Sequence, residues 1–192
     1  RMQVHHRPVG PCLLITPWNF PLAMATRKVG PAVAAGCTMV LKAAKLTPLT
    51  TQLFAQVMQE AGLPKGVLNV VNGDKDAVDA LIEAPEVKAL SFVGSTPIAE
   101  YIYSEGTKRG KRVQALGGAK NHAVLMPDAD VDNAVSALMG AAYGSCGERC
   151  MAIPLLVAVG DAVGDAVIAG LKTEIAKMKV GPGTDNGNDM GP

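Results

Sequence analysis

The sequence contains few of the residues on which several classes of protein depend. Aromatic residues make up 4% of its 192 residues, so an interior drawn from the 48% of hydrophobic residues must be mainly aliphatic. The 18 basic and 17 acidic residues form no long run of either sign, so nothing favours a nucleic acid or an anionic membrane as a partner. No stretch approaches the roughly 18 to 20 uninterrupted apolar residues of a membrane-spanning helix, and we expect none.

Cysteine and histidine are also scarce. The four cysteines are too few and too dispersed for a disulfide framework, so we expect reduced thiols. Cys146 and Cys150 lie four residues apart but have no second Cys or His pair nearby, and the sequence therefore predicts no metal site. The first residues lack the apolar segment of a secretory signal. These absences favour the cytoplasm, or the mitochondrial matrix in a eukaryote.

The chain alternates short apolar runs with longer amphipathic segments, and glycine or proline ends most of them. This alternation predicts an α/β fold with a Rossmann-like, mostly parallel sheet and helices on both faces, because parallel neighbours need crossover connections. The expected strands cover residues 13–16, 38–42, 67–71, 88–93, 112–116, 123–126 and 155–159. The expected helices cover residues 21–35, 50–61, 75–83, 94–103, 132–143 and 161–178.

The glycine pair Gly117–Gly118 interrupts this pattern. We place a domain boundary there, so that residues 1–117 form the Rossmann-like unit and residues 118–192 begin a second α/β domain. One face of the second expected helix is apolar and is expected to pack on the core; it carries Leu53, Val57, Met58 and Ala61.

Cys150 is the candidate nucleophile. It ends the glycine-punctuated loop 144–150, where Arg149 and the loop N–H groups favour its thiolate form. The alternative is a small buried hydrophobe, the commoner use of a single cysteine. For Cys146 the alternatives are packing or a resolving thiol under oxidation.

Two further candidates sit where expected strands end. Gly94 and Ser95 open a helix after an apolar strand, an arrangement whose free N–H groups suit a pyrophosphate, although Ser95 or Thr96 also suits a plain helix cap. There is no G-x-G-x-x-G fingerprint. Lys42 ends another expected strand and is either a ligand contact at the carboxyl edge of the sheet or a solvated side chain.

Five motifs occur in one order along the chain: Thr16–Pro21, Val40–Lys42, Phe92–Thr96, Leu116–Asn121 and Gly144–Cys150. In content, order and spacing they resemble the NAD(P)-dependent aldehyde dehydrogenase family, over essentially all 192 residues. That family also lacks the glycine fingerprint. Its members extend beyond both ends of this chain and form dimers or tetramers. We therefore expect a fragment or an engineered chain, incomplete at both ends, whose parent is a homo-oligomer.

The resemblance implies a role for individual residues. Asn19, otherwise a turn residue, would form the oxyanion hole with the N–H of Cys150. Lys42 would bind the adenosine ribose hydroxyls. Lys45 stands where many NAD-preferring relatives carry an acid, so we expect NADP to be tolerated or preferred. The implied cofactor-binding residues are Ile15, Thr16, Pro17, Trp18, Lys42, Lys45, Gly94, Ser95, Leu116 and Gly117.

The chain departs from the family at the general base. Hydrolytic members carry a Glu before the glycine pair, where this chain has Leu116 or, if the glycines are matched, Ala115. Neither can accept a proton, so the resemblance implies coenzyme A as acyl acceptor. That is the character of the methylmalonate-semialdehyde dehydrogenase branch, which residues 72–153 resemble, whereas residues 8–71 resemble succinate-semialdehyde dehydrogenases. A chimera and an unusual paralogue both fit this patchwork.

The expected substrate is a small semialdehyde whose distal carboxylate could meet Arg27 or Arg149. Two alternatives to this enzyme stay open at this point. In the first the chain is a catalytically inactive nucleotide-binding fragment, and in the second it is a module that is acylated on Cys150 without redox activity.

Overall fold

The structure is a computed structural model that describes residues 1–191. It divides into two compact units, and the division falls between Gly118 and Ala119, one residue from the expected boundary. Within residues 1–191 no helix is both long enough and apolar enough to cross a lipid bilayer.

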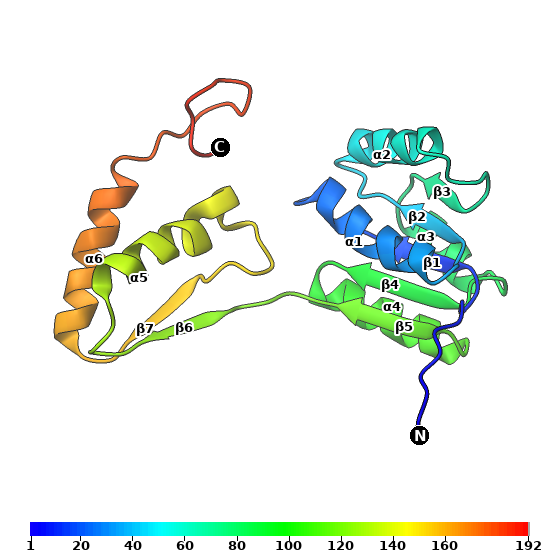
Figure 1. The fold of residues 1–192 in the computed structure, drawn as a ribbon, viewed down its shortest axis with the longest axis horizontal. Coiled ribbons are helices and arrows are strands. Elements are labelled where there is room, and N and C mark those ends of the chain that lie inside the picture. Colours follow the sequence, from blue (N-terminus) through cyan, green and yellow to red (C-terminus); the bar gives the residue numbers. More distant parts are fainter. Residues whose placement is uncertain (192) are drawn as a thin grey trace. The chain divides into compact units, whose positions relative to one another are not determined.

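The first unit is a five-stranded, all-parallel sheet in the order β3-β2-β1-β4-β5 (Figure 1). The chain builds outward from β1 to β3, then returns to the other side of β1 for β4 and β5. The strands are β1 (Cys12–Ile15), β2 (Met39–Lys42), β3 (Leu68–Val71), β4 (Ala89–Val93) and β5 (Arg112–Leu116). The helices are α1 (Pro21–Ala34), α2 (Pro48–Glu60), α3 (Lys75–Glu83) and α4 (Thr96–Lys108).

Helices cover both faces of this sheet, as the sequence pattern predicts. Leu13 and Ile15 of β1 pack with residues of α3 and α4, whereas Cys12 and Leu14 pack with α1 and α2. Alternate side chains of the central strand β1 therefore pack into two aliphatic cores, one on each face of the sheet. The fold class expected from the sequence is confirmed.

Proline and glycine set the ends of three helices. A proline stands in the first turn of α1, α2 and α4, where its missing N–H costs nothing. Just beyond the last turn of the same helices stand Gly36, Gly62 and Gly110, all at positive φ.

The second unit pairs two parallel strands, β6 (His122–Leu125) and β7 (Leu155–Ala158). Two helices, α5 (Val131–Leu138) and α6 (Asp161–Ile175), pack together around Val135, Leu138 and Val167. Asp130 caps α5, because its side chain accepts a hydrogen bond from the backbone N–H of Asn133 at 3.0 Å.

Of the four residues expected to pack on the core from α2, Met58 does so, whereas Leu53, Val57 and Ala61 are exposed. Leu53 and Val57 are 61% and 51% exposed, and the face that packs on the core carries Thr51, Phe54 and Met58. Both faces of this helix are apolar, so hydrophobic spacing alone chose the wrong one.

Lys28 of α1 is buried although its neighbour Arg27 is exposed. Its ammonium donates to Ser91 Oγ of β4 at 2.6 Å, and that hydroxyl donates to Gln114 Oε1 of β5 at 3.0 Å. Burial lowers the pKa of Lys28 from 10.5 to about 8.

Two helical glycines provide a matched test of packing. A Cβ at Gly106 of α4 would lie 2.6 Å from Val113 Cγ2, whereas one at Gly30 of α1 would meet no atom within 4 Å. We expect Gly106→Ala to lower the free energy of unfolding by about 1 to 3 kcal/mol through overpacking. Gly30→Ala should raise it by up to about 1 kcal/mol. Urea unfolding measures both, and equal effects would contradict the packing described here.

The buried charge of Lys28 predicts a pH dependence. Between pH 8 and 10.5 the unfolded chain holds the lysine proton more tightly than the folded chain, so the free energy of unfolding rises with pH across this window. Lys28→Met removes that contribution. The stability of the variant minus that of the parent chain should therefore fall by about 2 kcal/mol between pH 7 and pH 10. Chemical unfolding at each pH measures the difference, and a constant difference would show that Lys28 is not desolvated.

Candidate functional site

The register of the first unit gathers the predicted cofactor-binding residues at one edge of the sheet. Ile15, the last residue of β1, lies opposite Lys42 of β2 and Phe92 of β4. Two backbone bonds continue the alignment beyond the strands, from Thr16 N to Lys42 O at 3.3 Å and from Gly94 N to Leu116 O at 3.0 Å. The ten residues named from the sequence all lie in or directly after these carboxyl ends. In doubly wound sheets this edge, where the strand order reverses, is where ligands bind.

Glycine is required at two of these turns by the protein itself. A Cβ at Gly94 would lie 2.5 Å from the Phe92 ring, and a Cβ at Gly117 would lie 2.8 Å from Thr96 Oγ1 and 3.1 Å from its Cα. The same hydroxyl of Thr96 accepts a hydrogen bond from Gly118 N at 3.0 Å. Together these contacts hold the start of α4 against the end of β5.

Ser95 occupies the N-cap position of α4, but its side chain makes no capping hydrogen bond. The simple capping function that the sequence left open is therefore not used. The N–H groups of the first turn of α4 remain oriented as in anion sites at helix N-termini.

Two polar residues, Thr16 and Lys42, are buried at the carboxyl ends of β1 and β2. Within residues 1–191, Thr16 Oγ1 is buried and has no hydrogen-bond partner. Lys42 is also buried, and desolvation lowers its pKa, opposed in part by the charge of Asp74. An unsatisfied buried hydroxyl is costly, so this pair fits a polar ligand such as a ribose-containing dinucleotide.

Lys45, which was expected from the sequence to favour NADP, has an acidic partner in the structure. Its ammonium forms an ion pair with Asp74 Oδ2 at 2.7 Å. Asp74 precedes α3, and its hydrogen bond with Lys45 lowers the pKa of the carboxyl group. No sequence motif links these two residues, which lie 29 positions apart.

Asn19 lies half-buried in the turn between β1 and α1, in the first unit, whereas Cys150 belongs to the second unit. The oxyanion pair that they would form remains a prediction.

The loop that ends at Cys150 has an unusual backbone. After α5 come a π-helical turn (Met139–Tyr143) and a 3₁₀ turn (Gly144–Gly147). Ser145 and Cys146 adopt φ values of 55° and 56°, the left-handed region that costs about 1 kcal/mol or more for a residue with a side chain. The guanidinium of Arg149 folds back toward Gly140 O at 3.4 Å and fills the space where Gly144 lacks a Cβ.

The four thiols fall into two classes. Cys12 and Cys37 are buried in the core that packs against α1 and α2, and burial raises the pKa of Cys12 to about 11. Cys146 and Cys150 are exposed, and Cys146 Sγ donates to Gly191 O at 2.9 Å. The accessible thiols are thus the two in the loop, Cys146 and Cys150.

Asn121 is a residue whose role the sequence did not reveal. Its side-chain amide donates to Cys150 O at 3.0 Å and to Ala152 O at 2.9 Å, so it fixes the backbone on both sides of Met151. The Leu116–Asn121 motif contains it, but only the fold brings it to the cysteine loop.

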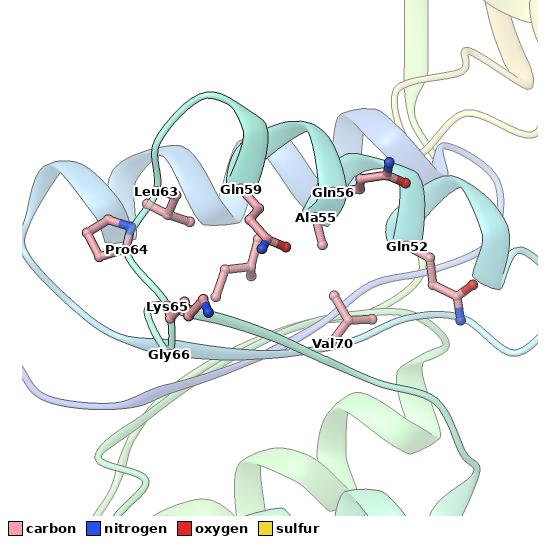
Figure 2. Close-up of a pocket in the computed structure, with 10 residues that line it drawn as sticks. Gln52, Ala55, Gln56, Gln59, Leu63, Pro64, Lys65, Gly66 and Val70 are labelled. Atoms are coloured by element: carbon pink, nitrogen blue, oxygen red, sulfur yellow. The ribbon is translucent and has the colours of Figure 1, made fainter.

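A separate hollow of about 420 Å³ lies between α2 and β3. Figure 2 shows Gln52, Gln56 and Gln59 of α2 on one side of it and Val70 of β3 on the other. It contains none of the residues predicted to bind a cofactor or to react.

Comparison with known proteins places these motifs in context. The model of the aldehyde dehydrogenase family matches residues 1–192. A malonate-semialdehyde dehydrogenase of Pseudomonas aeruginosa is 67% identical over 186 residues, which are 97% of this chain and 37% of that protein. The chain therefore spans little more than a third of the length of this relative.

Two solved structures have nearly the same fold. A putative methylmalonate-semialdehyde dehydrogenase from Sinorhizobium meliloti, complexed with NAD, is 50% identical with a TM-score of 0.94, covering 97% of this chain and 38% of that one. An NADP-dependent enzyme of E. coli is 41% identical with a TM-score of 0.93, covering 97% and 39%.

The contacts of Asn121 predict a local effect. Asn121→Ala removes both hydrogen bonds to the cysteine loop and should lower the free energy of unfolding by about 1 to 2 kcal/mol. It should also speed amide hydrogen exchange in residues 148–153, measured by mass spectrometry. Asn133→Ala, at an exposed position in the same unit, is the matched control. Equal exchange in the two variants would refute the anchoring role.

Proposed function

Because the chain belongs to the aldehyde dehydrogenase family, we propose that it supplies the cofactor-binding edge and the nucleophilic cysteine of an enzyme that oxidises a small semialdehyde with NAD or NADP. The observation that carries this proposal is the single sheet edge that gathers Thr16, Lys42 and the Gly94 turn. In this proposal residues 1–117 are the cofactor domain and residues 118–192 begin the catalytic domain. The names of the similar semialdehyde dehydrogenases support the substrate class.

In the proposed reaction the thiolate of Cys150 attacks the aldehyde carbon. The side-chain amide of Asn19 and the N–H of Cys150 stabilise the oxyanion that forms, and one such donor typically contributes about 3 kcal/mol to the transition state. NAD or NADP, which Thr16, Lys42 and the Gly94 turn would hold, would supply the acceptor for the hydride that leaves this carbon. The acyl group then remains on the Cys150 sulfur as a thioester.

The fate of the thioester depends on position 116. Leu116 is half-exposed at the end of β5 and its carbonyl accepts the Gly94 N–H, whereas Ala115 packs toward the core of the first unit. Neither side chain can remove a proton from water. We therefore propose coenzyme A as the acyl acceptor, whose thiol displaces the Cys150 sulfur and leaves it free for another cycle.

This proposal predicts a burst. Mixing the chain with malonate, methylmalonate or succinate semialdehyde and NAD or NADP should give about one equivalent of reduced cofactor per chain, with steady turnover only when coenzyme A is present. Absorbance of the reduced nicotinamide measures both phases. Leu116→Glu should raise turnover without coenzyme A by about 100-fold, because it supplies a general base.

Three variants control this experiment. Cys150→Ala should abolish the burst, Cys146→Ala should keep it, and Leu116→Gln should not produce hydrolysis. A folded chain that binds cofactor but gives no burst would identify a nucleotide-binding fragment. Acylation of Cys150 by a thioester without any reduced cofactor would instead identify an acylating module.

A further inference from the structure

The adenosine end of the predicted cofactor edge carries an unusual set of charges. In dinucleotide-binding sheets an acidic side chain after β2 commonly accepts the ribose 2′-hydroxyl, and a basic one accommodates a 2′-phosphate. Here residues 42–47, from the last residue of β2 onward, contain no acid and two lysines, Lys42 and Lys45. By its own sequence this segment would favour the phosphorylated ribose.

The fold brings a carboxylate to this segment from the neighbouring strand. Lys42 lies opposite Val71, the last residue of β3, and Asp74 follows three residues later. Asp74 Oδ2 accepts the hydrogen bond of Lys45 Nζ at 2.7 Å, and its charge also acts on Lys42. Three charges from two strand ends therefore share this corner of the edge.

Both partners of the ion pair remain accessible. The side chains of Lys45 and Asp74 are 65% and 72% exposed, so a ligand at the edge can reach them. Exposed ion pairs contribute little to folding stability. A carboxylate has about four acceptor sites, and Lys45 uses one of them.

We propose that Asp74 is a specificity-determining residue that makes the site favour NAD over NADP. Its carboxylate neutralises Lys45, accepts the ribose 2′-hydroxyl and repels a 2′-phosphate, which carries about 1.5 to 2 negative charges. The acid that this fold usually takes from β2 is supplied by the turn after β3. The inference rests on the proposed cofactor site, and it reverses the preference expected from Lys45 alone.

The test compares two probes that contain only the adenosine half of the cofactors. Isothermal titration calorimetry of the whole chain with 5′-AMP and with adenosine 2′,5′-bisphosphate gives a ratio of affinities that needs no catalysis. Asp74→Asn should shift this ratio about tenfold toward the bisphosphate, because it frees Lys45 and removes the repulsion. Lys45→Gln should shift it about tenfold the other way. Both shifts should shrink as salt is added.

Asp76→Asn is the matched control, because Asp76 is an exposed acid in the first turn of the same helix and makes no ion pair with Lys45. The ratio of affinities for the two nucleotides in Asp76→Asn should stay within about twofold of that in the parent chain. If Asp74→Asn changes the ratio no more than Asp76→Asn does while 5′-AMP still binds, the role of Asp74 is refuted and the cofactor site stands. If neither nucleotide binds the folded chain, both the cofactor site and the role of Asp74 are refuted.

Discussion

The geometry of the proposed cofactor-binding edge depends on the register of one strand. β1 is the central strand of the sheet, and its last residue lies opposite Lys42 on one side and Phe92 on the other. A parallel strand moved by one residue would turn its side chains to the opposite faces, exchanging Leu13 and Leu14 between the two cores. The burial of both faces thus fixes where every turn at the carboxyl edge begins.

The same packing accounts for the electrostatic character of the edge. Leu13, Leu41 and Met39 are almost fully buried, so the segment that leads to Lys42 is anchored by aliphatic contacts. Lys42 and Thr16 are held in an apolar setting because their neighbours along the strands are buried apolar residues. Polar atoms placed in this way by a rigid scaffold are typical of binding sites. The side chains of Lys45 and Asp74, by contrast, are exposed to solvent.

Sequence reasoning predicted most of the fold and only part of the site. The elements were found because β-sheet spacing, helix spacing and the breakers Gly36, Gly62 and Gly117 are local signals. The inward face of α2, the burial of Lys28 and the contact of Asn121 with the cysteine loop were missed, because each depends on which distant element packs there. The Lys45–Asp74 pair joins two strand ends that are neighbours only in the folded sheet. The left-handed backbone at Ser145 and Cys146 was also missed, because neither residue is a glycine, the usual signal of positive φ.

The close contacts at Gly94 and Gly117 affect how variants of this sequence should be compared. Each glycine is enforced by a neighbour inside the first unit, the Phe92 ring for one and Thr96 for the other. Selection for folding alone is therefore enough to preserve both positions. A divergent copy that had lost its nucleophile would still retain them. Retention of these glycines in a relative therefore indicates that the packing is kept, and does not indicate activity. In the mechanism proposed above, the residues that would distinguish an active copy from a decayed one are Cys150, Asn19 and the side chain at position 116.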